Sequence, residues 1–222
     1  MIDRRFTQAI EAPDARTPSL HAVGAVIASL LILAGATAGN AETPPPVDAT
    51  APYLEEARRL AKSFSSRLQG ELQAALSASE PQNAVANCRL VAPAKANELT
   101  EQHGWSVART ALRVRNPRNA PTLRERAVLL DFQRRAAAGE HLSAMEHIAI
   151  VEDGGLPYVH YMRAITTGGV CLTCHGESID DPVREAIAAL YPADAATGFT
   201  PGSLRGAFTF VRPLAPAEEH SP

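Results

Sequence analysis

Residues 147–165 read HIAIVEDGGLPYVHYMRAI, a stretch with the pattern of two strands joined by a tight turn. Two strand-like runs, His147–Val151 and Tyr158–Ile165, flank Asp153-Gly154-Gly155. An Asp-Gly step between two runs of apolar and β-branched residues is a strong signal for a β-hairpin. The stretch therefore predicts two antiparallel strands.

Helices are predicted on the amino-terminal side of this hairpin. Apolar residues from Ala57 to Leu76 recur at steps of three and four, as on one face of an amphipathic helix. The other predicted elements are a strand over Trp105–Val114, a loop over Asn116–Pro121, a helix from about Pro121 to Ala138 ending at Gly139, a short helix opened by Asp181-Pro182 and reaching Leu190, and a strand over Ala207–Val211. Helices first and a mostly antiparallel sheet afterwards predict an α+β domain.

One further helix is predicted between Ser79 and Gly104. Ser79 with Gln82 resembles a capping box, and Gly104 suits a helix carboxyl-terminal cap. Pro93 is expected to kink or restart the helix, because proline cannot donate a backbone hydrogen bond. Cys88 is expected to point inward, because it shares one helix face with Val85, Ala92, Ala96 and Leu99.

A short motif, Cys171-Leu172-Thr173-Cys174-His175, has the C-x-x-C-H spacing of a covalent attachment site for c-type haem. We expect Cys171 and Cys174 to form the thioether bonds and His175 to be the proximal iron ligand. A zinc site would need a second close pair of ligands, and a thioredoxin-type pair would need a βαβ setting. Glycines before and after the motif predict that it lies in a loop. One covalently bound haem c is therefore the expected cofactor.

The amino-terminal segment resembles a secretory signal. Arginines precede an apolar run at 22–38, and small residues end at Ala41. We expect residues 1–41 to be a signal peptide, with an uncleaved membrane anchor over 22–38 as the alternative. Residues 42–52 would then be a Pro-rich linker, 53–214 one domain and 215–222 a tail. The expected location is the periplasm or another exported compartment, which agrees with haem attachment outside the cytoplasm.

Net charge gives little sign of a charged partner. The formal charge is −3, which predicts neither nucleic acid nor an anionic membrane surface as a partner. Membrane contact is expected only if the amino-terminal segment is retained.

Several ordered segments resemble a known family. They are Asn87-Cys88-Arg89, Gly104-Trp105, Arg115-Asn116-Pro117-Arg118-Asn119-Ala120-Pro121, Cys171-Leu172-Thr173-Cys174-His175-Gly176, Leu190-Tyr191-Pro192, Ala196-Thr197-Gly198-Phe199 and Leu204-Arg205-Gly206-Ala207. This set resembles a family of PAS-like c-type haem domains of unknown function. Members of that family are monohaem, cytochrome c-like proteins. The resemblance implies a PAS-like antiparallel sheet flanked by amino-terminal helices, with His175 and Cys88 as the axial pair. Phe199 stands where the family more usually has Tyr, a departure expected to touch no ligand.

The residues alone leave the distal ligand of the iron open. A lone cysteine on an apolar helix face is usually a core residue, and His and Met are commoner haem ligands. His160 is the main rival of Cys88 because its strand leads to the motif, and the alternative for His160 is a solvent-facing strand position. The other candidates are Met145, Met162, His103, His141 and His147.

Charged residues near these motifs allow two interpretations, as partners of the haem propionates or as solvent-exposed charges. Arg109, Arg113 and Arg115 share one face of a predicted strand, and Arg205 precedes the last strand. Arginine suits a haem propionate, but a solvated strand face would carry such charges in any case. Glu146, Glu152 and Asp153 have no evident partner.

These features predict a periplasmic monohaem protein that acts as a redox sensor or signal-input module, with an unidentified redox or signalling protein as its partner. The alternatives are an electron-transfer cytochrome c and a haem enzyme such as a peroxidase. We expect no enzyme, because the sequence holds no nucleophile–base set, phosphate loop or further metal cluster.

Overall fold

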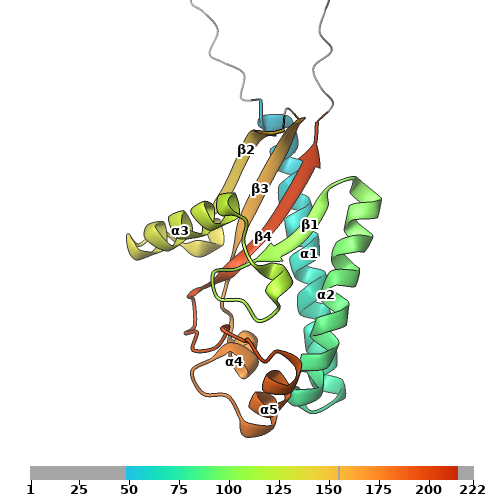
Figure 1. The fold of residues 1–222 in the computed structure, drawn as a ribbon, viewed down its shortest axis with the longest axis vertical. Helices are drawn as coiled ribbons and strands as arrows, with labels where there is room; N and C mark the ends of the chain where they lie inside the picture. The colour runs from blue at the N-terminus through green and yellow to red at the C-terminus, as the bar shows by residue number, and fades with distance from the viewer. Residues whose placement is uncertain (1–48, 155, 215–222) are drawn as a thin grey trace, which may run out of the picture. The chain divides into compact units, whose positions relative to one another are not determined.

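A four-stranded sheet with helices on both faces forms the part of the chain that the computed structural model describes, residues 49–154 and 156–214 (Figure 1). The predicted signal peptide at 1–41, most of the predicted linker and the predicted tail at 215–222 lie outside these residues. Gly155 of the predicted hairpin turn also lies outside them. No helix within the described ranges combines the length and apolar character needed to cross a membrane.

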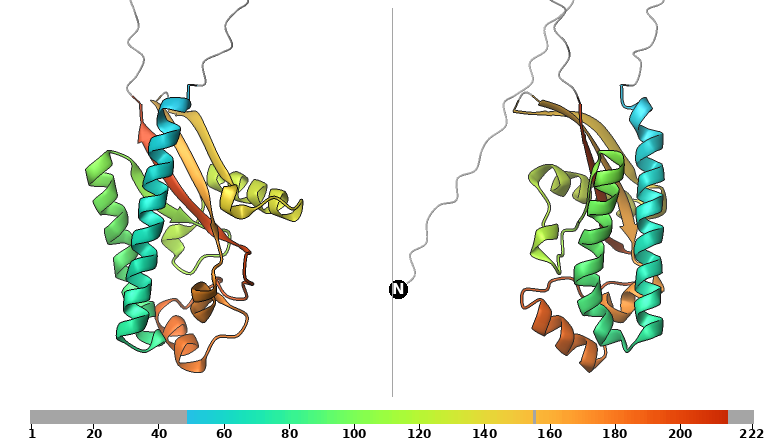
Figure 2. Two further views of the ribbon diagram at one scale, coloured as in Figure 1. Left: turned by 180° about the vertical axis from the view of Figure 1, so that it is seen from behind. Right: turned by 90° about the vertical axis from the view of Figure 1, so that its right-hand side faces the viewer.

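Two long helices, α1 (Ala51–Ala78) and α2 (Pro81–His103), run antiparallel along one face of the sheet (Figure 2). Pro52, assigned to the linker from sequence, instead lies in the first turn of α1, where its fixed φ suits a helix. The predicted Ser79–Gln82 capping box is wrong. Helix α2 starts at Pro81 without a side-chain cap, and the Ser79 hydroxyl donates to the carbonyl of Ala75.

Helix α2 contains Pro93 and continues as one element to His103, so the predicted restart is not seen. Its predicted carboxyl-terminal cap is confirmed: Gly104 has φ 68°, a left-handed conformation that glycine adopts without a Cβ penalty.

Helix α3 (Leu123–Ala137) crosses the opposite face of the sheet (Figure 2). A capping box that sequence patterns missed starts it: Thr122 Oγ1 accepts from the Glu125 N–H, and a Glu125 carboxylate oxygen accepts from the Thr122 N–H. Two short 3-10 turns that were not predicted, η1 (Pro117–Asn119) and η2 (Leu142–Ala144), lie on either side of α3 in the chain.

The sheet has the order β1-β4-β3-β2, and all neighbours are antiparallel. Its strands are β1 (Ser106–Thr110), β2 (Glu146–Asp153), β3 (Leu156–Thr166) and β4 (Leu204–Pro213). The predicted hairpin is β2–β3. The first strand is shorter than predicted, because the chain leaves the sheet after Thr110. The predicted α+β class, with an antiparallel sheet and amino-terminal helices, is confirmed.

Both faces of the sheet are packed, as the two-residue period of its strands requires. One face carries Tyr161 and Phe210 against α1 and α2, in a cluster with Phe64 and Trp105. On the other face, Met162, Ala164 and Ala207 of the sheet pack with Met145 against buried residues of α3: Val128, Leu129 and Phe132.

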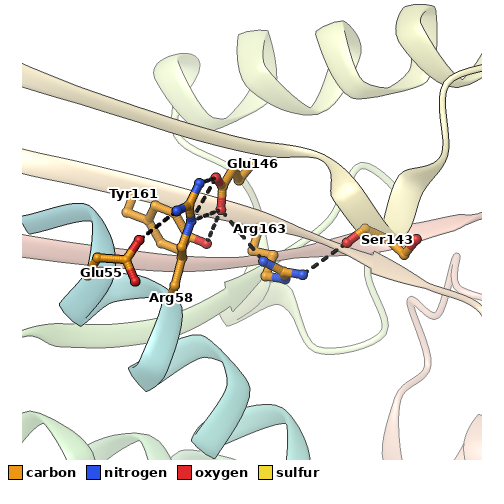
Figure 3. Close-up of polar contacts among 6 residues, drawn as sticks. All are labelled: Glu55, Arg58, Ser143, Glu146, Tyr161 and Arg163. Carbon is orange, nitrogen blue, oxygen red and sulfur yellow. Dashed lines mark hydrogen bonds and ion pairs between the residues drawn. The ribbon is translucent and has the colours of Figure 1, made fainter. Parts of the chain in front are cut away.

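Glu146 ties α1 to strands β2 and β3 (Figure 3). Its carboxylate accepts from the Arg58 guanidinium and from the Tyr161 hydroxyl, and Arg163 lies 3.6 Å away. The bond from Arg58 lowers the pKa of Glu146, and burial raises the pKa of Tyr161 to about 12. Sequence patterns showed no partner for Glu146 because its partners lie on two other elements, Arg58 on α1 and Tyr161 and Arg163 on β3.

Two short helices, α4 (Gly169–His175) and α5 (Asp181–Leu190), lie at the end of the sheet where β3 ends and β4 begins (Figure 1). Asp180, one residue earlier than predicted, is the amino-terminal cap of α5. Val85 of α2 packs against Val183 and Ile187 of α5, which fixes α5 beside the first turns of α2. The motif at 171–175 is thus placed next to α2.

Candidate functional site

The motif at 171–175 lies on a seven-residue helix, α4, so its predicted loop conformation is wrong. Gly168 is extended before the helix and Gly176 is extended after it, and these two glycines bound the helix rather than break it. A Cβ at Gly176 would lie 2.6 Å from the Leu172 carbonyl oxygen, so only glycine fits there. Helical spacing of three and four residues puts Cys171, Cys174 and His175 on one face of α4.

The His175 ring is held in one orientation. Its Nδ1 lies 2.6 Å from the carbonyl oxygen of Ala196. A carbonyl oxygen only accepts, so Nδ1 carries the proton and Nε2 has a free lone pair. Burial lowers the pKa of His175 to about 3, and the charges of Arg205, Arg115 and Arg109 add to this effect. His175 is therefore a neutral imidazole with Nε2 as its unprotonated nitrogen.

An ion pair between Arg115 and Asp194 supports this arrangement. Two guanidinium nitrogens of Arg115 each lie 3.1 Å from an Asp194 carboxylate oxygen, and the two side chains are only 11% and 9% exposed. The same guanidinium donates to the carbonyls of Cys174 and Ala196, at 2.6 and 3.3 Å. Asp194 also accepts from the Ala196 N–H at 2.9 Å. The pair thus joins the end of α4 to the carbonyl that orients His175.

Sequence reasoning missed Asp194, because its partner lies 79 residues away and no local pattern marks it. Arg115 was considered as a propionate partner or a solvated charge, and the structure supports neither reading. Its guanidinium is taken up by Asp194 and by backbone carbonyls.

Phe199 packs against the predicted ligand His175. The two rings meet edge to face with centroids 6.2 Å apart, and the Phe199 N–H donates to the His175 carbonyl at 2.9 Å. The expectation that this position touches no ligand is therefore wrong. The guanidinium carbons of Arg113 and Arg205 lie 4.5 and 5.0 Å from the ring centroid, which is cation–π geometry.

Cys88 lies on α2, and it is exposed to solvent rather than packed in the core as predicted. Val85, one turn earlier, packs in a cluster that includes Cys174 and Tyr191. Although the residue is exposed overall, groups packed around the Cys88 thiol withdraw it partly from water and raise its pKa, while the charges of Arg109 and Arg115 lower it. Burial also raises the pKa of Cys174. The charge of Arg115 lowers this pKa, and the charge of Cys88 raises it by a smaller amount. The structure therefore brings Cys88 near Cys174, Arg109 and Arg115.

The other candidate distal ligands lie elsewhere. His160 is buried in the sheet, not solvent-facing, and its Nε2 is 3.0 Å from Thr209 Oγ1. It precedes Thr166, the last residue of β3, by six positions, which is roughly 20 Å along a strand. His147 pairs with the His160 ring, His103 and His141 are exposed, and Met145 and Met162 are buried against α3.

No three His, Cys, Asp or Glu side chains within residues 49–154 and 156–214 are grouped so that they could hold a bare metal ion. The functional groups of the site, among the described residues, are three thiols, one neutral imidazole and several guanidinium groups. Two of the thiols share a helix face with the imidazole.

Residues 46–213 of the chain match the Tll0287-like family. Among solved structures, the chain is similar to the crystal structure of the cyanobacterial heme-protein Tll0287. That likeness has 25% sequence identity and a TM-score of 0.54, and it covers 73% of this chain and 97% of the other. Among curated proteins no match was found.

Proposed function

The chain belongs to the Tll0287-like family, and from this premise we propose that it is an exported c-type haem protein acting as a redox sensor or signal-input module. In this proposal one haem is attached through Cys171 and Cys174, and His175 and Cys88 are the axial ligands. The observation that carries it is the shared face of α4, on which two free thiols accompany a neutral imidazole with a fixed ring.

The residues present fit a haem. Thioether attachment needs two thiols that are not otherwise bonded, and Cys171 and Cys174 are free and half-buried. An iron ligand needs an unprotonated nitrogen, which His175 Nε2 supplies because Nδ1 donates to Ala196. A backbone acceptor on the far nitrogen is the usual way in which a metal-binding histidine is oriented.

The surroundings of Cys88 support its role as the second ligand. Arg109 and Arg115 are the charges that lower the pKa of its thiol, and positive charge favours the thiolate, the form that binds a metal. Burial acts in the opposite direction, so Cys88 Sγ holds its proton at neutral pH when it is not bonded to a metal. Binding to a metal would therefore release this proton.

A thiol that loses its proton when it binds the iron supports a redox-linked change of ligand. When bound, the haem supplies a one-electron redox couple, whose oxidised state is favoured by an anionic ligand. Cys88 Sγ can therefore bind as a thiolate in one redox state and take up a proton in the other. Because Cys88 lies on α2, such a change would act on α2 and on α5, which packs against Val85.

Mass spectrometry of the denatured full-length protein, produced in a host that matures cytochromes c, tests the cofactor. We expect the mass of one haem on the wild type and none on Cys171→Ser/Cys174→Ser. The matched control, Cys88→Ser, should keep its covalent haem. A wild-type mass without haem would contradict the proposal.

Visible spectra of the oxidised and reduced protein, recorded from pH 5 to 9, test the switch. A sensor of this kind should show a change of axial ligand on reduction, with proton uptake that Cys88→Ala abolishes. Identical ligation in both redox states would contradict the sensor and favour an electron-transfer cytochrome c.

A further inference from the structure

Positive charge gathers around His175. Arg205 lies 5.0 Å from the centroid of the Phe199 ring, which meets the His175 ring edge to face, and Arg115 donates to the carbonyl of Cys174, the residue before His175. Arg109 lies on β1, and its charge acts on His175 together with those of Arg205 and Arg115. Arg205 is also near Cys171, and Arg109 is near Cys88 and Tyr191. These guanidinium groups therefore approach the same site from two strands and a loop.

The described residues offer one carboxylate to this group. Asp194 is that carboxylate, and it forms a bidentate ion pair with Arg115. The Arg115–Asp194 pair has no net charge, so Arg109 and Arg205 leave two positive charges near His175 without an acidic partner among the residues described.

Among the described residues, neither the Arg109 nor the Arg205 guanidinium forms an ion pair with a carboxylate. Within the described ranges, the Arg109 side chain has no hydrogen-bond or ion-pair partner. The Arg205 guanidinium donates only through Nη1, to the Arg113 carbonyl at 3.2 Å, and otherwise lies over the Phe199 ring. Both are half-buried, and burial is the main cause that lowers the pKa of each, to about 10 for Arg205. Guanidinium groups withdrawn from water are normally paired with an anion.

Arg113 differs from these two residues. It is exposed, its Nε donates to the Ala195 carbonyl at 3.1 Å, and it is not among the charges that act on His175. Arg113 and Arg115 therefore donate hydrogen bonds to the loop at 194–199, whereas among the described residues Arg109 and Arg205 form no hydrogen bond to it.

We propose that Arg109 and Arg205 bind the two propionate groups of the haem, one carboxylate each. Haem carries two such carboxylates, which equal the two positive charges in number and are opposite to them in sign. Arginine presents a planar pair of donors that suits a carboxylate. The inference rests on the proposed haem attachment.

The test uses the full-length haem-loaded protein with Arg109→Gln, Arg205→Gln and the double variant, and Arg118→Gln as an exposed control. Removal of a positive charge near the iron favours the oxidised state. We expect the midpoint potential to fall in each single variant and further in the double variant, and the propionate bending bands in resonance Raman spectra to shift. Arg118→Gln should change neither quantity.

Lysine variants separate charge from shape. Arg109→Lys and Arg205→Lys should keep a near-wild-type potential but still shift the Raman bands, because lysine keeps the charge and lacks the fork. If a Gln variant carries no haem, the propionate bending bands of the corresponding Lys variant provide the test, and an unshifted band would count against that arginine. Potentials and bands that match the Arg118→Gln control would overturn the inference. A wild type without covalent haem would instead overturn the proposed function.

Discussion

Removal of the Asp194 carboxylate should destabilise the protein strongly. Asp194 accepts two bonds from Arg115 and one from the Ala196 N–H, and both side chains of the pair are at most 11% exposed. Asp194→Ala leaves a buried guanidinium and a backbone N–H without their partner. Breaking a buried ion pair in this way typically costs 3–5 kcal/mol, so we expect the free energy of unfolding to fall by about 4 kcal/mol.

Two further variants calibrate that number. Asp194→Asn keeps the shape and one oxygen acceptor but loses the charge, so a loss of about 2 kcal/mol is expected. Arg134→Gln breaks an ion pair whose arginine is 76% exposed, and it should change the free energy of unfolding by less than about 0.5 kcal/mol.

Urea unfolding of the full-length protein, followed by far-ultraviolet circular dichroism, measures all three variants. A cost of less than about 1 kcal/mol for Asp194→Ala would contradict this expectation, because the pair would then contribute no more than a surface ion pair.

Three other predictions concern single residues of the fold. Burial lowers the pKa of His160 to about 4, below its value of about 6.5 in the unfolded chain. Between these two pH values the unfolded state binds a proton at His160 and the folded state does not, so acid favours unfolding. Wild-type stability should therefore fall by roughly 3 kcal/mol more than that of His160→Gln as the pH drops from 7 to 4, and equal losses in urea unfolding would contradict this. Gly206→Ala places a Cβ 2.4 Å from the Thr110 carbonyl oxygen and should cost about 2 kcal/mol, whereas Gly70→Ala meets nothing within 4 Å in α1 and should be neutral or stabilising in the same assay. Thr122→Ala removes the α3 cap and should cost about 1 kcal/mol; a melting temperature equal to the wild type would show that the capping box contributes nothing.

The class of fold was predictable because it depends on local patterns. The alternation around Asp153-Gly154 predicts the β2–β3 hairpin, and the three- and four-residue recurrence from Ala57 predicts α1. Errors arose where a residue type allows two outcomes. Pro52 can end a linker or open a helix, and the glycines around residues 171–175 can form a loop or bound a helix.

The site was predictable only in part. The C-x-x-C-H spacing identifies the residues of α4, but the features that orient them come from distant segments. Arg115 meets Asp194 across 79 positions, and Ala196 acts through its backbone carbonyl, which no side-chain pattern can reveal. Which of the arginines donate hydrogen bonds to the loop at 194–199 also depends on tertiary contacts.

Electron paramagnetic resonance of the oxidised full-length protein tests whether His175 and Cys88 are the two iron ligands. The wild type should give the low-spin Fe(III) signal of a thiolate ligand, and Cys88→Ala should lose it. His160→Gln, which changes a buried histidine distant from α4, should keep the wild-type signal. A spectrum of Cys88→Ala identical to that of the wild type would contradict the account.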